Sequence, residues 1–150
     1  MPKCWLAISN RANWEVAKNN KIWGVSYRNR KIIAKVKSGD FVLFYISSQY
    51  FDKKLLPVIV TGAFEVTAPV FEEHTKIFST PQGKEDEVYP FRIKLKPIKI
   101  FINPILFVPL IPKLSFISNK RMWNGYIRGR GIREIPEEDY NEILNSIMKK

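Results

Sequence analysis

Residues able to carry out catalysis are few in this 150-residue sequence. It has one histidine, His74, and one cysteine, Cys4, and neither lies in a nucleophile motif. The single cysteine cannot form an internal disulfide, and the two residues together cannot make a conventional Cys/His zinc site. Gly129 and Gly131 flank Arg130, but neither phosphate-cradling pattern, GxGxxG or GxxxxGK, occurs. We therefore expect no catalytic residues, no cofactor and no metal.

Binding chemistry is better represented, in two basic segments that contain no acidic residue. They span 28–37 and 113–133, with Tyr27 beside the first and Trp123 and Tyr126 within the second. Cationic side chains neutralise phosphates, and aromatic rings stack on unpaired bases. The alternative for either segment alone is a solvated surface. The side chains that we predict to bind phosphates are Arg28, Arg30, Lys31, Lys120, Arg121, Arg128 and Arg130.

The charge of the whole chain points to the same kind of partner. Lys and Arg number 25 against 14 Asp and Glu, a formal net charge of +11. On a small domain this surplus favours nucleic acid first and an anionic membrane surface second. The most apolar window, 100–112, is interrupted by prolines and is shorter than the roughly 20 residues that span a bilayer. We read it as an irregular connection, and expect a soluble, cytoplasmic protein with no membrane partner.

The elements that must position these residues are mostly strands. Apolar runs predict strands at 5–8, 41–46 and 58–66, the last with a bulge at Gly62. The segment 88–96 alternates apolar and basic residues, which predicts a half-buried strand with Arg92 on its basic outer face. Residues 99–102 could extend this strand. The polar segment 72–87 predicts a surface loop.

One helix is predicted near each end of the chain. Ser9 and Asn10 supply N-cap chemistry for a helix at 11–20. A second helix starts at Pro136 with three acidic residues at its positive end and Lys149-Lys150 at its negative end. Its apolar face is Tyr140, Ile143, Leu144 and Ile147. The length and an apolar fraction of 45% predict a single α+β domain over residues 1–150, with a barrel-like mixed sheet.

Trp23 and Gly24 have two interpretations. A tryptophan in the apolar run Ile22-Trp23-Gly24-Val25 is ordinarily a core residue. A neighbouring glycine leaves the backbone accessible, however, and a flat ligand needs this if the indole lines a pocket. Ser9 and Asn10 could then hydrogen-bond to such a ligand.

Several ordered motifs resemble the EVE domain family. They are Trp5-Leu6-Ala7-Ile8-Ser9-Asn10-Arg11-Ala12-Asn13-Trp14, Ile22-Trp23-Gly24-Val25, Val36-Lys37-Ser38-Gly39-Asp40 with Leu43-Phe44-Tyr45, Leu114-Ser115-Phe116-Ile117 through Trp123, and Ile132 to Tyr140. The resemblance covers nearly the whole chain. It implies a PUA-like mixed β-barrel with flanking helices, related to the YTH domain, and a reader of modified bases in DNA or RNA such as 5-methylcytosine or 6-methyladenine.

The resemblance also implies a base-binding pocket. Trp23 matches the first tryptophan of the YTH aromatic cage, and Gly24 matches the residue whose carbonyl faces the base. In place of a second tryptophan, the following loop offers Phe71 or Phe78, so methyladenine specificity is not implied. The expected pocket residues are Ser9, Asn10, Asn13, Trp23, Gly24, Tyr45, Ser47 and Phe78.

Three alternatives remain open. A plain PUA-like module could recognise the shape of tRNA or rRNA without preferring a modified base. The related ASCH group includes amidohydrolases that act on acylated cytidine with a lysine and a carboxylate, for which Lys21, Lys31 and Glu65 are available. A protein-interaction domain with incidental charge is the third. We expect a monomer whose partner is DNA or RNA carrying a modified base.

Overall fold

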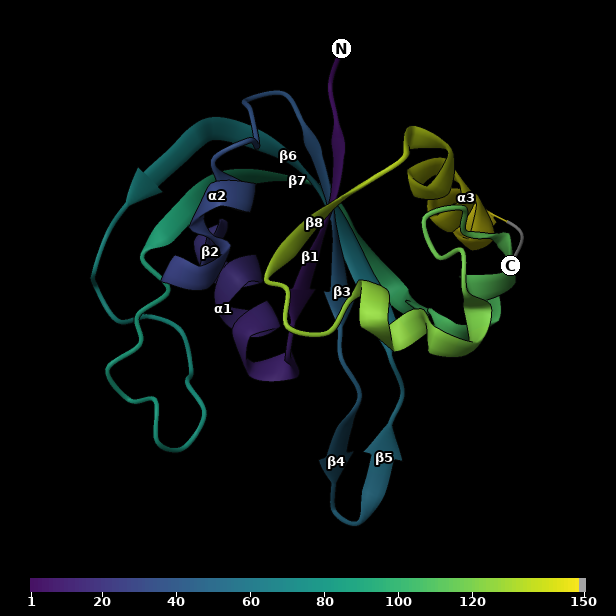
Figure 1. Cartoon of the computed structure of the whole chain (residues 1–150), viewed down its shortest axis with the longest axis horizontal. Helices are drawn as coiled ribbons and strands as arrows, with labels where there is room; N and C mark the ends of the chain where they lie inside the picture. The colour runs from purple at the N-terminus through teal and green to yellow at the C-terminus, as the bar shows by residue number, and fades with distance from the viewer. Residues whose placement is uncertain (149–150) are drawn as a thin grey trace.

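One curled sheet organises the molecule. The computed structural model describes residues 1–148, the side chains of 147 and 148 excepted. The strands of the main sheet are β1 (Cys4–Ser9), β2 (Ile22–Val25), β3 (Phe41–Ile46), β6 (Ile59–Glu72), β7 (Phe91–Leu106) and β8 (Ile132–Ile135). They lie in the order β2-β7-β6-β3-β1-β8, with β1 and β3 parallel and the other neighbours antiparallel. A hairpin of β4 (Gln49–Phe51) and β5 (Lys54–Leu56) projects from this body (Figure 1).

Helices cover both sides of the sheet. The α-helices are α1 (Arg11–Asn20), α2 (Arg30–Ile33) and α3 (Glu137–Met148), and the 3₁₀ helices are η1 (Tyr27–Asn29), η2 (Val108–Lys113) and η3 (Lys120–Tyr126). In Figure 1, α1 and α2 lie on one side of the sheet and α3 on the other. The expected α+β, PUA-like architecture is confirmed as a six-stranded half-barrel with a C-terminal helix.

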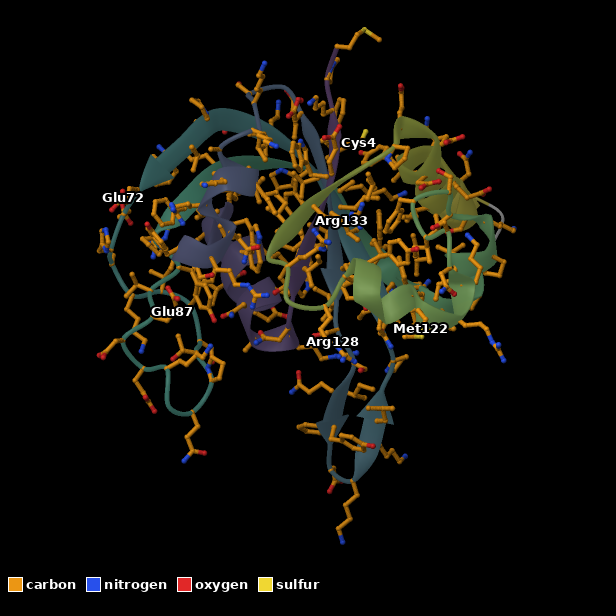
Figure 2. All side chains as sticks on the ribbon, viewed as in Figure 1. Cys4, Glu72, Glu87, Met122, Arg128 and Arg133 are labelled. Carbon is orange, nitrogen blue, oxygen red and sulfur yellow. The ribbon has the colours of Figure 1, made fainter. Side chains whose placement is uncertain are left out.

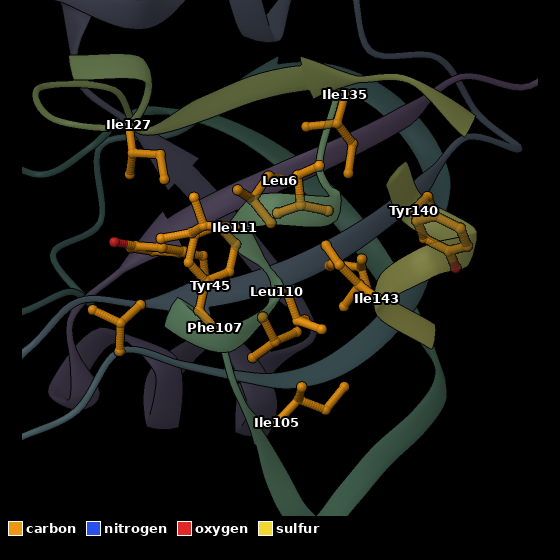
Figure 3. Close-up of a cluster of buried hydrophobic side chains, with 14 of the residues drawn as sticks. Leu6, Tyr45, Ile105, Phe107, Leu110, Ile111, Ile127, Ile135, Tyr140 and Ile143 are labelled. Carbon is orange, nitrogen blue, oxygen red and sulfur yellow. The ribbon is translucent and has the colours of Figure 1, made fainter. Parts of the chain in front are cut away.

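The sheet separates two apolar clusters because side chains alternate along each strand. Phe44 of β3 belongs to the cluster under α1 and α2, together with Trp5, Trp14 and Trp23. Its neighbour Tyr45 points to the opposite cluster, which is packed beneath α3 and η2. Figure 3 shows Tyr45 in this second cluster beside Phe107 and Ile111. Alternate residues of each strand therefore contribute to the two different clusters.

Several predicted elements are confirmed. The helix at 11–20 and the strand at 41–46 have the predicted bounds. Asn10 is the N-cap of α1, and its side chain accepts a hydrogen bond of 2.8 Å from the backbone N–H of Asn13. The pairing of β6 with β7 shifts register next to Gly62, as the predicted bulge requires. The helix α3 begins directly after Pro136, while Lys149, Lys150 and the side chain of Ile147 lie outside the described residues.

The long strands differ from the prediction. The strand at 58–66 runs on to residue 72, and the strand predicted at 88–96 begins at 91 and continues to 106. Half of the window 100–112 is therefore strand, and 108–113 is 3₁₀ helix. Pro104 is tolerated in β7 because it lies opposite a break in the ladder, between the pairs Gly62–Ile100 and Val60–Ile105.

The single histidine lies at the surface and the single cysteine lies in the core. His74 is exposed and lies 2.7 Å from the carboxylate of Glu72. Cys4 is a buried free thiol, and burial raises its pKa to about 11. In the described residues 1–148, no helix has both the length and the apolar character needed to cross a membrane.

Candidate functional site

A cavity of about 210 Å³ lies where the two outer strands of the curled sheet approach each other. An apolar cavity of about 150 Å³ is enough to hold a six-membered aromatic ring, so this one has room for a single nucleobase. Its walls come from β1, the start of α1, β2, the loop before β7 and the segment before β8. The lining residues are Ile8, Ser9, Asn10, Asn13, Trp23, Gly24, Val25, Ser26, Asn29, Phe78, Tyr89, Gly129, Arg130 and Gly131. We call it the Trp23 cavity.

Trp23 is both a core residue and a wall of this cavity. Its side chain is only 4% exposed, and its ring packs edge-on against Phe44 and Phe78, with centroids 5.4 and 5.6 Å away. Its indole Nε1 donates a hydrogen bond of 2.9 Å to the carbonyl oxygen of Gly131. The orientation of the indole is therefore fixed by packing and by one directional bond.

The loop 73–90 supplies another wall through Phe78 and Tyr89. Asn13 holds this loop to α1 by two bonds with Ser79, donating from Nδ2 to its carbonyl at 3.0 Å and accepting from its N–H at 2.7 Å. The predicted pocket residue Asn13 thus has both ends of its amide engaged. Asn13 therefore fixes the position of Phe78, the residue next to Ser79, at the cavity wall.

Arg92 holds the same loop from beneath. Its side chain is fully buried and donates hydrogen bonds to the carbonyl oxygens of Tyr89 (3.0 Å), Val88 (2.9 Å) and Thr75, and to the carboxylate of Glu73 (3.0 Å). Burial lowers the pKa of the guanidinium, an effect that Glu73 opposes. The prediction of Arg92 on a basic outer face is therefore wrong. The loop carbonyls recruit its guanidinium inward, an interaction that strand alternation does not encode.

Gly24 allows the loop to approach β2. A Cβ atom at this position would lie 2.6 Å from the carbonyl oxygen of Tyr89 and 2.9 Å from a ring carbon of Phe78. Any larger residue would push away the loop backbone at Tyr89 and the ring of Phe78. The structure thus gives Gly24 a packing role at the cavity wall.

Two polar lining residues differ in their availability. Ser9 donates its hydroxyl to the carbonyl of Asn10 at 2.8 Å. Asn29 lines the cavity, is 8% exposed, and its side chain has no hydrogen-bond partner among the described residues. Its amide can therefore donate to and accept from the edge of a ligand. Sequence reasoning missed Asn29 and Tyr89, because neither lies in a motif that marks a pocket.

Comparison with known proteins identifies the family of this chain. The model of the EVE domain family matches residues 3–146. The chain belongs to the EVE domain family. It is 45% identical to a UPF0310 protein of Pyrococcus abyssi over 96% of this chain and 98% of that protein. It is 41% identical to a UPF0310 protein of Pyrococcus horikoshii over 93% and 94%.

Solved structures share the EVE fold at low sequence identity. Human THYN1 in complex with 5-methylcytosine containing DNA has a TM-score of 0.65 at 17% identity, covering 99% of this chain and 98% of that one. The Mmi1 YTH domain has a TM-score of 0.61 at 15% identity and covers 99% of both chains. The expected relation to the YTH fold is confirmed.

Tyr45 and Ser47 do not line the Trp23 cavity of this EVE domain. They line a second cavity of about 580 Å³ at the base of the β4–β5 hairpin, which we call the hairpin cavity. The expectation of a shared pocket is therefore wrong. Strand alternation explains the difference, because Trp23 packs on Phe44 and the next residue, Tyr45, faces the other side of the sheet. Phe71, the other candidate for the second wall, lines a separate hollow beside α2.

The predicted phosphate-binding residues divide into two groups. Arg130 lines the Trp23 cavity, Arg128 lines the hairpin cavity, and the guanidinium of Arg28 lies 3.3 Å from where a Cβ of Gly129 would be. Arg128 and Arg130 belong to the segment 128–130, and Arg28 lies against it.

The other four predicted phosphate ligands lie elsewhere. Arg30 stacks on Tyr27 at 3.5 Å and, with Lys31, lines the hollow beside α2. Lys120 donates to the carbonyl of Leu114 at 2.6 Å. Lys120 and Arg121 are exposed on η3 and line neither cavity.

The residues considered for an amidohydrolase are not gathered at the Trp23 cavity. Lys21 is the C-cap of α1, Lys31 belongs to α2, and Glu65 belongs to β6. None of the three lines the cavity. Within residues 1–148, no group of three His, Cys, Asp or Glu side chains could hold a metal ion.

Proposed function

We propose that this EVE domain binds nucleic acid and holds one base, turned out of its strand, in the Trp23 cavity. The observation that carries the proposal is the cavity itself: a base-sized space with aromatic walls, a free amide at Asn29 and cationic side chains around it. The complex of human THYN1 with 5-methylcytosine containing DNA supports it, since that protein has the same fold.

A preference for a modified base is part of the proposal. Burying one extra methyl group is worth only about 1 kcal/mol. Strong discrimination therefore needs a polar mismatch with the wrong base, because an unpaired buried donor or acceptor costs more. Asn29 can create this mismatch by hydrogen bonding to one arrangement of groups on the base edge and not to another.

The free-energy cost of turning a base out of its strand can be offset by contacts in this cavity. Turning a base out of a duplex costs a few kcal/mol, and less from a single strand. Stacking on an aromatic side chain returns roughly 1–3 kcal/mol. Tyr89 is partly exposed, unlike Trp23 and Phe78, so an entering base reaches its ring most readily. Contacts from Arg28, Arg128 and Arg130 to phosphates would add affinity without sequence preference.

The test is a competition measured by fluorescence anisotropy at one fixed, near-physiological salt concentration. The competitors are short DNA and RNA oligomers with and without 5-methylcytosine, 5-hydroxymethylcytosine or 6-methyladenine. The variant is Asn29→Leu, which keeps the side-chain volume and removes the hydrogen bonds, and the matched control is the exposed Asn119→Leu. We expect the wild type and the control to prefer one modified oligomer, and Asn29→Leu to lose that preference while still binding.

The same experiment separates the alternatives. Uniform, steeply salt-dependent binding by the wild type would indicate a general nucleic-acid module. Incubation with N-acylated cytidine, followed by chromatography for free cytidine, tests the enzyme alternative. Release of cytidine at a rate above that of a protein-free control would contradict a purely binding role.

A further inference from the structure

The hairpin cavity is a second space next to the proposed base site. Ile8 and Gly129 line both cavities, so the two share a wall. Its other side is the base of the β4–β5 hairpin, through Ser47, Ser48 and Leu55. In Figure 2, Arg128 lies close to this hairpin base.

The lining of the hairpin cavity has the chemistry that a nucleotide needs. Trp123 is half-buried and packs on Phe107 at a centroid distance of 5.9 Å. Ser48 and Asn124 are exposed neutral hydrogen-bonding residues, and Arg128 is an exposed cation. Among the described residues, no acidic side chain lines the cavity or forms an ion pair with Arg128. An aromatic ring can stack on a base while the guanidinium binds its phosphate.

The segment between the cavities sets their spacing. Arg130 lines the Trp23 cavity, Arg128 lines the hairpin cavity, and Gly129 lines both. Residues two positions apart are separated by at most about 7 Å, which is comparable with the separation of successive phosphates in an extended strand. Gly129 has a φ of 77°, a left-handed conformation that favours glycine. Arg128 and Arg130 therefore lie about one nucleotide spacing apart, and each lines one of the two cavities.

We propose that the hairpin cavity binds the nucleotide directly next to the base held in the Trp23 cavity. The domain then reads two neighbouring nucleotides, with Trp123 stacking on the second base and Arg128 on its phosphate. This inference rests on the proposed function, because the first base must occupy the Trp23 cavity. It makes the presence of a base at one flanking position a determinant of affinity.

The test uses oligomers in which the nucleotide on one side of the central modified base, or on the other, is replaced by an abasic site. The proteins are the wild type, Trp123→Ala and the control Met122→Ala, whose side chain is exposed on the same 3₁₀ helix and lines neither cavity. We expect one abasic position to weaken wild-type binding by about 5-fold to 150-fold, the range given by the loss of one base stack. Trp123→Ala should weaken binding of the intact oligomer similarly and show no further loss with the abasic one.

A second variant distinguishes loss of the binding contact from loss of folding in Trp123→Ala. Ser48→Trp fills the hairpin cavity from an exposed position without removing a packed side chain, and we expect it to act like Trp123→Ala. The inference is overturned if abasic sites on both sides leave wild-type affinity unchanged, or if they weaken wild type and both variants equally. The proposed function fails by a different result, an equal affinity of the wild type for modified and unmodified oligomers. Both abasic positions are therefore tested in oligomers with a modified central base and in oligomers with an unmodified one.

Discussion

The indole of Trp23 and the carbonyl of Gly131 join the two outer strands of the curled sheet. The 2.9 Å bond between them links β2 to the residue directly before β8, and the same carbonyl accepts a bond of 3.0 Å from the backbone N–H of Ile8. Val25 of β2 also packs against Gly131, since a Cβ there would lie 2.6 Å from a Val25 methyl. The wall of the Trp23 cavity is therefore also the contact that completes the half-barrel.

Removing this bond should loosen the cavity. Trp23→Phe keeps an aromatic ring but loses the N–H and part of the volume, and we expect a loss of about 1–3 kcal/mol in the free energy of unfolding. Affinity for the preferred oligomer should fall as well. Urea denaturation and anisotropy measure the two effects. Trp14→Phe is the control, because Trp14 lies in the same cluster but does not line the cavity. Equal retention of affinity in both variants would contradict this prediction.

Gly24→Ala should open the loop side of the same cavity. The added Cβ would meet the Tyr89 carbonyl oxygen and the Phe78 ring at under 3 Å, and backbone cannot yield as cheaply as a flexible side chain. We expect destabilisation of about 1–3 kcal/mol, the usual range for overpacking, and a loss of base preference. Gly125→Ala is the matched control, since nothing lies within 4 Å of the corresponding Cβ. Thermal unfolding and the oligomer competition provide the readouts. Base preference retained by a folded Gly24→Ala protein would count against this wall.

The elements around the cavity were predictable because local rules determine them. Asn10 starts α1 by capping, and the apolar run 41–46 forms a buried strand, so both have the predicted bounds. The ordered motifs around Trp23 led to the family. These signals act within a few residues of the chain.

The remaining parts of the site depend on contacts between distant residues. Arg92 turns inward because carbonyls of a loop up to 17 residues away accept its hydrogen bonds. Asn29 lines the cavity next to the distant segment before β8, where a Cβ of Gly131 would lie 3.5 Å from its Nδ2. The face to which Tyr45 points follows from strand alternation relative to Phe44, which could have been applied to the sequence. The pairing of Trp23 with Gly131, 108 residues apart, carries no local signal.

Arg92→Lys tests whether the loop 73–90 is held from below. A lysine keeps the charge, but its ammonium cannot span the separated acceptors that the planar guanidinium reaches. We expect a loss of about 1–3 kcal/mol in stability, because buried carbonyls are left unpaired. Hydrogen exchange of loop amides should accelerate more than exchange in α3. Lys94→Arg, at an exposed position of the same strand, is the control. Unchanged loop exchange in a folded Arg92→Lys protein would show that the guanidinium of Arg92 is not needed to hold the loop.

The buried thiol of Cys4 should make stability fall at alkaline pH. Burial, with the nearby charges of Glu137, Asp40 and Glu134, raises its pKa from 9.0 to about 11. Above pH 9.0 the unfolded chain loses this proton while the folded chain keeps it, so the stabilisation is fully present below pH 9.0 and lost as the pH rises through about 11. Tyr45 and Tyr140 add the same trend above pH 10.0, since burial raises the pKa of each to about 12.

Urea denaturation across this range, with wild type and Cys4→Ala, isolates the contribution of the thiol. The variant should be less stable at neutral pH because it leaves a small cavity, but its decline between pH 9.0 and 10.0 should be shallower. Parallel curves for the two proteins would show that Cys4 does not titrate differently on unfolding. In the folded wild type, alkylation of the thiol should be slow at neutral pH.

Salt dependence should distinguish the arginines around the two cavities from the rest of the basic surface. Each phosphate contact contributes about 0.7–0.9 to the slope of log affinity against log salt concentration, because one counterion is released. We expect Arg28→Ala, Arg128→Ala and Arg130→Ala each to reduce the slope by about this amount. Lys99→Ala, which removes the same charge from an exposed position of β7, should leave the slope nearly unchanged. Titrations with one oligomer at several salt concentrations give each slope. If Lys99→Ala and the three arginine variants change the slope equally, the binding surface follows net charge and is not centred on the segment 128–130.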